Sequence, residues 1–298
     1  MKRLSRFLAS ANSKGIAWML LAILLFTLMD AAAKGLIDIY PAPQVVWARF
    51  TGQAILVLLF LSRRGIVKSL QTQHPKLHLL RSVFQLGATS FFFLSLAYIG
   101  LPEATALADI SPVLITVGAA LFLGERLDGP QILAVVIALI GALIIIRPGM
   151  GVFSLAAFLP IACAVCYAGN ALLTRFIGSK EAPWGSLLHS ALFGCIVLSL
   201  ALPLFWVPIA PRHIAIFALI GVLGTCAQFC IIRSFSVAEA MVVAPFTYFG
   251  ILFATLWGAL FFGQYPDQWT VVGALVIVAS GLYVWQHQTW GQSAKSTE

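Results

Sequence analysis

The chain is poor in charged residues, which excludes an ordinary soluble fold. Only 9% of its 298 residues are charged, 61% are hydrophobic, and the mean hydropathy is +0.98. Soluble domains carry about 25% charged residues. The composition therefore predicts that most of the chain lies in lipid.

Cysteine and histidine are scarce, at five each, and all five cysteines fall in apolar stretches, where a thiol acts as a small filler. Two pairs of these cysteines, Cys163/Cys166 and Cys226/Cys230, have a spacing that is compatible with the ligands of a metal site. Such sites favour ligands on short loops with further hydrogen-bond partners. The sequence also has neither Gly-x4-Gly-Lys-Ser/Thr nor Gly-x-Ser-x-Gly. It therefore predicts no metal, no cofactor, no enzyme activity and no direct use of ATP.

What the chain does have is ten apolar stretches, each near the roughly 20 residues that a membrane span needs. The short connections leave no room for a soluble domain, and open sheet edges are not tolerated in hydrocarbon. The predicted spans are 16–34, 44–62, 79–99, 104–123, 131–147, 153–174, 184–204, 213–232, 240–262 and 269–287.

The second five spans repeat the pattern of the first five. A shift of 139 residues places Gly124-Glu125 over Gly263-Gln264 and Asp128 over Asp267. A repeat with an odd number of spans ends on the opposite side of the bilayer, so its copy inserts upside down. We therefore predict an all-α integral membrane protein of ten transmembrane helices in two inverted five-helix repeats, residues 1–149 and 150–298. This is the plan of a secondary transporter.

The basic residues predict the orientation of the chain. With the amino terminus in the cytoplasm, 14 of the 18 fall on the cytoplasmic side, as the positive-inside rule requires. This distribution explains the net charge of +8 without a nucleic-acid partner. It predicts a multi-pass inner-membrane protein with both termini in the cytoplasm. The 14 residues are Lys2, Arg3, Arg6, Lys14, Arg63, Arg64, Lys68, Lys76, Arg81, Arg126, Arg175, Lys180, Arg233 and Lys295.

Several motifs resemble those of a known transporter family. Glu103–Pro112, followed by Leu123–Arg126, resembles the fourth-helix signature of the EamA-type branch of the drug/metabolite transporter superfamily. Met29–Lys34 and Trp47–Phe50 resemble its first and second helices. The resemblance implies ten helices in two inverted repeats, and cargo such as amino acids, vitamin-like or nucleotide-sugar-like metabolites and metal-chelating metabolites. The second repeat departs from the pattern, with Gln264 where the family turn usually has Glu.

Three ionisable residues are expected at a similar depth in the outer half of the membrane. At 1.5 Å per residue, Asp30 lies about 20 Å along the first span, and Arg49 and Asp109 lie about five residues inside spans that start outside. Ionisable groups in lipid usually face the bundle interior. Asp30 or Asp109 is expected to carry a proton or bind a substrate amine, and Arg49 to bind a carboxylate. The alternative is a structural ion-pair network. Lys34 is expected to snorkel to the membrane surface.

Neutral polar residues complete the candidate site. The repeat matches Asn170, His189 and Tyr248 to Asp30, Arg49 and Asp109. His189 either titrates near physiological pH or serves as a packing residue. Gln85 and Gln228 are expected either to bind substrate or to join helices. Tyr98 is expected either to stack on a planar substrate or to face lipid.

Three prolines are expected to interrupt helical hydrogen bonding within spans and to produce gating kinks or static bends. They are Pro112, Pro160 and Pro245.

These features predict a secondary active transporter that moves small organic metabolites by alternating access. Export of amino-acid-like or metallophore compounds is expected, with uptake of a planar vitamin such as riboflavin as the alternative. The expected partners are a small-molecule substrate, the lipid bilayer and a candidate coupling proton; the sequence specifies no oligomeric state. A membrane-embedded enzyme fits less well because no nucleophile–base set is apparent. A channel fits less well because its ring of charges calls for oligomeric symmetry.

Overall fold

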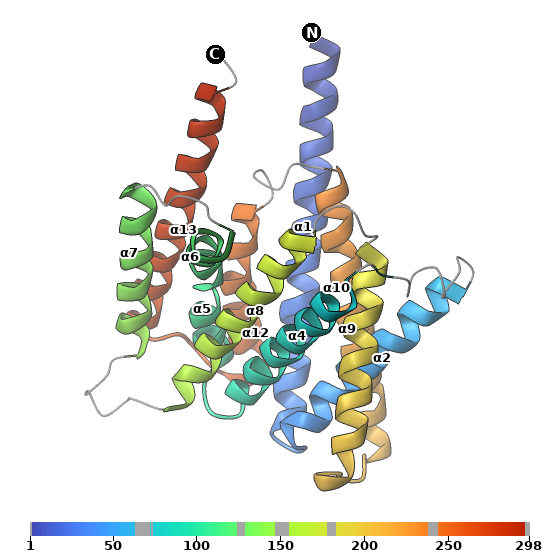
Figure 1. The fold of residues 1–298 in the computed structure, drawn as a ribbon. Helices are drawn as coiled ribbons and strands as arrows, with labels where there is room; N and C mark the ends of the chain where they lie inside the picture. Colours follow the sequence, from blue (N-terminus) through green and yellow to red (C-terminus); the bar gives the residue numbers. More distant parts are fainter. Residues whose placement is uncertain are drawn as a thin grey trace.

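The computed structural model describes residues 2–62, 72, 74–123, 129–146, 155–177, 183–237 and 244–295, and these form helices joined by short connections (Figure 1). The elements are α1 (Lys2–Ile37), α2 (Ala42–Ser62), α4 (Pro75–Leu96), α5 (Leu101–Ala108), α6 (Ser111–Leu123), α7 (Gly129–Ile146), the 3-10 turn η1 (Leu155–Ala157), α8 (Phe158–Ile177), α9 (Pro183–Ala201), η3 (Leu202–Leu204), α10 (Pro211–Val237), η4 (Ala244–Tyr248), α12 (Phe249–Phe262) and α13 (Gln268–Lys295).

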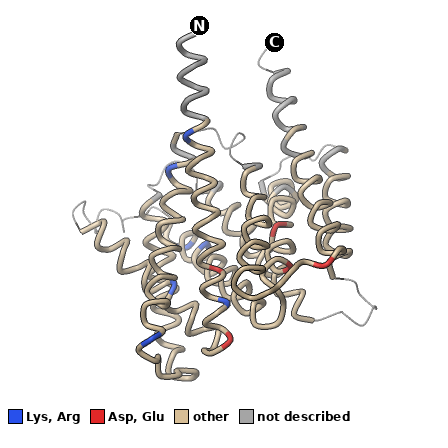
Figure 2. The backbone as a smooth tube through the Cα atoms, turned by 180° about the vertical axis from the view of Figure 1, so that it is seen from behind, with Lys and Arg blue, Asp and Glu red and all other residues tan. Residues whose placement is uncertain are grey.

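The apolar helices correspond to the predicted spans. Within the described residues, seven are long and apolar enough to cross a membrane, and three apolar helices are shorter. Charged residues are sparse along the described backbone (Figure 2). The predicted all-α fold of ten membrane helices is confirmed. The seven long helices are Ser13–Ile37, Ala42–Ser62, Pro75–Leu96, Leu101–Phe122, Leu155–Thr174, Trp184–Leu204 and Pro211–Ser234, and the shorter ones are Ile132–Ile146, Phe246–Phe262 and Gln268–Tyr283.

Helices of one half pack against helices of the other half in matched pairs. Helix α1 packs against α10, as α8 packs against α4, and the same matching relates α2–α10 to α9–α4 and α1–α12 to α8–α6. Helices α7 and α13 lie together at one edge of the molecule, whereas α2, α9 and α10 lie at the other (Figure 1). Both termini leave from the same end of the bundle (Figure 1). This arrangement is that of two inverted repeats.

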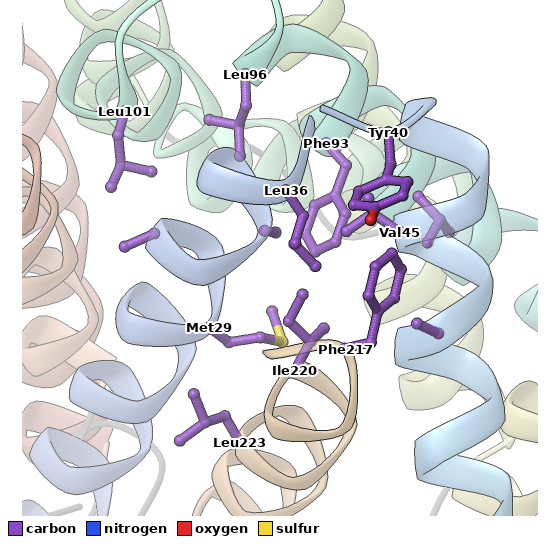
Figure 3. Close-up of a cluster of buried hydrophobic side chains, with 14 of the residues drawn as sticks. Met29, Leu36, Tyr40, Val45, Phe93, Leu96, Leu101, Phe217, Ile220 and Leu223 are labelled. Atoms are coloured by element: carbon purple, nitrogen blue, oxygen red, sulfur yellow. The ribbon is translucent and has the colours of Figure 1, made fainter. Parts of the chain in front are cut away.

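The largest buried cluster joins α1, α2, α4 and α10 and is drawn in Figure 3. It combines side chains of both repeats, among them Met29, Leu36, Phe93 and Ile220, each no more than 1% exposed. Lipid is as apolar as leucine, so close van der Waals packing, not release of water, holds such helices together.

Glycines allow the closest approaches between the repeats. A Cβ atom added to Gly52 of α2 would lie 2.6 Å from the Cα of Gly221 on α10. A Cβ added to Gly141 of α7 would lie 2.9 Å from the carbonyl oxygen of Gly273 on α13. At both crossings backbone meets backbone, because small residues let membrane helices approach closely.

The fourth span, predicted over 104–123 with an interruption at Pro112, is broken into two helices. Helix α5 ends at Ala108, a turn follows at Asp109 and Ile110, and α6 starts at Ser111. Pro112 explains the break, since it has no N–H to continue the α-helical ladder. In the second repeat the described part of the matching segment starts with the 3-10 turn Ala244–Tyr248. The predicted interruptions near Pro112 and Pro245 are therefore present.

The prediction for Pro160 was wrong. This residue is the third of α8, directly after η1. Backbone N–H groups in the first turn of a helix have no intrahelical acceptor, so proline is accommodated there without interrupting the span.

Lys34 does not snorkel, in contrast to the prediction. It is 4% exposed, and its Nζ donates hydrogen bonds to the carbonyl oxygens of Leu96 (2.8 Å) and Ile99 (3.1 Å). The ammonium also lies 5.8 Å from the ring centroid of Phe262. These carbonyls lie in the last turn of α4 and just beyond it, where a helix has free acceptors. Lys34 thus joins the end of α1 to the end of α4.

We predict that Gly52→Ala lowers the apparent melting temperature of the purified protein. The added methyl group meets backbone that cannot rotate away, and overpacking of this kind costs about 1–3 kcal/mol. Gly129→Ala is the matched control, since a Cβ there has nothing within 4 Å. Equal melting temperatures for the two variants would contradict the close crossing.

Lys34→Met is expected to destabilise the protein by about 1.5–3 kcal/mol, the usual range for hydrogen bonds that involve a charged group. Lys14→Met removes an exposed lysine from the other end of the span and should have little effect. Thermal unfolding in detergent, followed by size-exclusion chromatography, measures both. A Lys34→Met protein as stable as the control would show that the two carbonyl bonds contribute nothing net.

Candidate functional site

Arg49 on α2 holds its guanidinium among aromatic rings. Its Cζ lies 5.8–5.9 Å from the ring centroids of Phe26, Phe50 and Phe93, which is cation–π distance. Nη1 donates a 2.7 Å hydrogen bond to Thr89 Oγ1 of α4. Nε is buried and has no hydrogen-bond partner within the described segments. The charge is therefore stabilised without using all of its donors.

Asp30 on α1 is half-buried and lies within electrostatic range of Arg49. Within the described part of the chain, no ion pair or hydrogen bond engages its carboxylate. The two groups attract each other without closing a direct bridge. The predicted neighbourhood of Asp30 and Arg49 is present, but the predicted alternative of an ion-pair network has no direct contact at this point.

Asp109 occupies the break between α5 and α6. Its backbone N–H donates to the carbonyl oxygen of Thr105 at 3.0 Å, which closes the last turn of α5. Its side-chain Oδ2 is buried without a hydrogen-bond partner among the described residues. The interrupted helix thus presents a carboxylate oxygen with unused acceptor capacity in the interior of the bundle.

Cys163 of α8 lies near the carboxylates of both Asp30 and Asp109. Its thiol lies within electrostatic range of Asp30, Arg49 and Asp109. One turn along α8, the phenol of Tyr167 lies within range of Cys163 and Asp109. These groups come from four different spans, so only the folded bundle brings them together.

Tyr248, at the end of η4, completes this set from the second repeat. Its phenol lies within electrostatic range of Asp109, and its hydroxyl sits against Gly281 of α13, where a larger residue would collide with it. We call the following residues the central cluster: Asp30, Arg49, Asp109, Cys163, Tyr167 and Tyr248.

The central cluster can recognise a zwitterion. A guanidinium with unused donors suits a carboxylate, and a carboxylate with unused acceptors suits an amine or a proton. Tyr167 is 48% exposed although its phenol lies near buried Asp109 Oδ2. Tyr167 therefore combines an exposed part with a phenol close to the charged groups.

A second polar group lies between α4, α8 and α9. Arg81 is 8% exposed and donates from Nε to Thr174 Oγ1 (2.8 Å), and from Nη1 to the Ser186 carbonyl oxygen (2.8 Å) and Ser190 Oγ (3.2 Å). The Asn170 amide donates to the Arg81 carbonyl oxygen (3.2 Å). The sequence placed Arg81 on the cytoplasmic side and within the predicted span 79–99, and in the structure this residue lies buried within α4.

Three sequence candidates belong to this second group. Asn170 also donates to Gln85 Oε1 at 2.9 Å, so these two side chains join α8 to α4. The His189 ring lies 5.0 Å from that of His78, and its Nδ1 donates to the Gly185 carbonyl oxygen at 2.8 Å. We call Arg81, Gln85, Asn170, Thr174, Ser190 and His189 the Arg81 cluster.

The remaining two candidates lie apart. Tyr98 is 66% exposed in the turn after α4, away from both clusters. Gln228 is half-buried on α10, and its side chain makes no hydrogen bond within the described chain. Within the same residues, no three His, Cys, Asp or Glu side chains gather as a metal site would require.

Some sequence predictions concern residues outside the described segments. They include part of the turn motif, Gly124–Arg126, and basic residues used to predict the orientation: Arg63, Arg64, Lys68, Arg126, Arg147 and Lys180.

Arg81 and Cys163 are members of these clusters that sequence analysis missed. Arg81 falls inside the predicted span 79–99, and this position was the available signal. Cys163 carries no signal of its own in the sequence, because a thiol in an apolar run is an ordinary packing residue.

Comparisons with known proteins agree with this architecture. The model of the EamA-like transporter family matches residues 13–147 and again residues 154–285. A solved crystal structure superposes with a TM-score of 0.64 at 18% sequence identity, covering 91% of this chain and 96% of that one. The likeness to that structure shows the fold.

Curated relatives are named as transporters of different compounds. The chain is 29% identical to the pseudopaline exporter of Pseudomonas aeruginosa over 271 residues, covering 89% of this chain and 94% of the relative. It is 30% identical to the riboflavin transporter of Vibrio cholerae over 284 residues (93% and 94%). It is 24% identical to the S-adenosylmethionine uptake transporter of Rickettsia prowazekii over 282 residues (94% and 95%). The chain belongs to the EamA-like transporter family, as its motifs predicted, and is a multi-pass membrane transporter of small molecules, not an enzyme.

Proposed function

We propose that this protein is a secondary active transporter of the inner membrane that exports amino-acid-like or metallophore compounds. It works by alternating access between repeats 1–149 and 150–298, with both termini in the cytoplasm. The observation that carries the proposal is Arg49, a guanidinium that other helices enclose while its buried Nε has no partner among the described residues.

Arg49 is suited to the carboxylate of the cargo. Guanidinium presents a planar fork of donors that matches a carboxylate, and in a low dielectric such a bond is stronger than in water. The phenylalanine rings stabilise the cation while the site is empty, and they leave donors available. Ionisable groups within spans usually mark substrate or ion pathways.

Asp30 and Asp109 are suited to a proton or a cargo amine. Each has a carboxylate without a hydrogen-bond partner within the described residues, and the Cys163 thiol lies within range of both. A carboxylate that exchanges a proton for a cationic cargo would couple transport to the proton gradient. The similarity to the pseudopaline exporter supports the outward direction.

Uptake of a planar vitamin such as riboflavin is the second candidate. The similarity to riboflavin transporters supports it, together with accessible aromatic rings. Tyr167 is 48% exposed, and Phe246 and Phe249 lie nearly parallel with their centroids 6.0 Å apart. Such rings can stack on a flat substrate.

We expect amino acids or metallophores to raise the melting temperature of the purified protein, because a ligand that binds the folded state stabilises it. Arg49→Gln should weaken this binding at least about tenfold, the loss expected for one charged hydrogen-bonded pair. The matched control is Arg212→Gln, which removes an exposed arginine from the first turn of α10. Stabilisation by riboflavin alone, insensitive to Arg49→Gln, would instead select vitamin uptake.

If Asp30 or Asp109 carries the coupling proton, Asp30→Asn or Asp109→Asn should express normally and abolish the pH dependence of transport. Transport into proteoliposomes, measured with a ligand from the stability screen at several pH values, tests this. Asp38→Asn, at an exposed position, is the control. Reduced expression with unchanged pH dependence would assign the carboxylates a purely structural role.

A further inference from the structure

Arg81 carries a buried positive charge for which the described chain supplies only neutral partners. The guanidinium is bonded to two hydroxyl groups and one carbonyl oxygen, from Thr174, Ser190 and Ser186. No carboxylate of the described residues forms an ion pair with it or lies in its electrostatic range. A buried charge without a counter-charge is costly, so its presence in a span requires a reason beyond helix packing.

The arrangement leaves donors available. Nε and Nη1 of Arg81 donate hydrogen bonds, whereas Nη2 neither forms a hydrogen bond within the described chain nor is completely buried. Beside it, the Oε1 of Gln85 accepts from Asn170, and its amide nitrogen is likewise unengaged and not fully buried. Thr174 at the edge of the cluster is exposed, and Gln85 and His189 are half-buried. Arg81 and Gln85 are four residues apart on α4, so their unengaged donors belong to the same face of this helix.

Such a site selects a small oxyanion. Its available groups are N–H donors around one positive charge, and a carboxylate accepts from a guanidinium and an amide together. The two imidazoles that line the cluster, His78 and His189, add no negative charge in either protonation state. A cationic or apolar ligand would leave the donors unsatisfied.

Helix α4 relates this site to the central cluster. Arg49 is bonded to Thr89, eight residues after Arg81 on the same helix, which corresponds to about 12 Å along its axis. The end of α4 near Leu96 lies beside the end of α1, so Arg81, in the second turn of α4, lies toward the end where the termini emerge. The two arginines therefore lie at different depths along one helix.

We infer that Arg81 forms a second binding site for a carboxylate of the cargo, closer than Arg49 to the end of the bundle that bears the termini. The inference rests on the proposed function, because it assigns the carboxylate to a transported molecule. The cargo occupies the Arg81 site on one side of the transport cycle and the Arg49 site on the other.

The test measures binding in the absence of Arg49. Arg49→Gln protein in detergent is titrated with sodium glutamate, against sodium chloride of equal ionic strength, and the melting temperature gives the apparent affinity. We expect stabilisation by glutamate to persist, and Arg49→Gln/Arg81→Gln to weaken it at least about tenfold. Arg49→Gln/Arg212→Gln is the matched control, since Arg212 is exposed in the first turn of α10. Absence of glutamate stabilisation in Arg49→Gln, or its persistence in the double variant, would overturn the inference.

The same comparison separates the two proposals. If Arg49 binds no carboxylate, Arg49→Gln alone has the wild-type glutamate curve, and the effect of Arg81→Gln is still measured. Phosphatidylglycerol in mixed micelles tests the other source of an oxyanion. Stabilisation by this lipid but not by glutamate, lost in Arg81→Gln, would assign the site to a lipid headgroup and overturn the inference.

A conservative variant guards against loss of folding. Arg81→Lys keeps the charge but loses the planar fork, so glutamate binding should weaken while the protein still folds. A residue that only joins helices would change the melting temperature without changing the glutamate affinity.

Discussion

The structure depends on one constraint: a charge inside the spans has to be stabilised by other helices, because lipid offers neither water nor counter-ions. Three buried or half-buried cations meet it in different ways. Lys34 uses free carbonyl oxygens at a helix end, Arg49 uses aromatic rings and a threonine, and Arg81 uses hydroxyl groups and a carbonyl. Each solution draws on at least two helices, so these charges also fix the arrangement of the bundle.

The two repeats share a fold but not their chemistry. Asp30, Arg49 and Asp109 belong to the first repeat, and the second contributes Cys163, Tyr167 and Tyr248 to the central cluster. Inverted duplication places these sets face to face, since the first helix of each repeat packs against the third of the other. One half therefore supplies the charges and the other a neutral polar and aromatic surface, which is enough to orient a polar molecule.

Much of the fold could be predicted from the sequence, because hydropathy and an odd number of spans determine insertion and inversion. The charged residues of the central cluster were predictable from depth, since Asp30, Arg49 and Asp109 lie at matching distances along their spans. The contacts between helix faces could not be predicted from the sequence. Hydropathy gives no information about the rotation of a helix about its axis. For this reason Lys34 was expected to reach the membrane surface, although it is buried. Tyr98 was assigned to the site for the same reason, although it is exposed. Arg81 was missed for a related reason, since a charge near a span end is usually a loop residue.

The glycine crossings have a mechanical consequence. Gly52–Gly221 and Gly141–Gly273 each join one repeat to the other, and they lie at opposite edges of the bundle (Figure 1). At Gly52–Gly221 backbone contacts backbone, whereas at Gly141–Gly273 the side chains of Ile145, Val276 and Ile277 also pack at the crossing. Both crossings lack room for a side chain between the two backbones, so they hold the two halves at their closest separation. A tilt of one half against the other about the line that joins the two crossings would displace these contacts least.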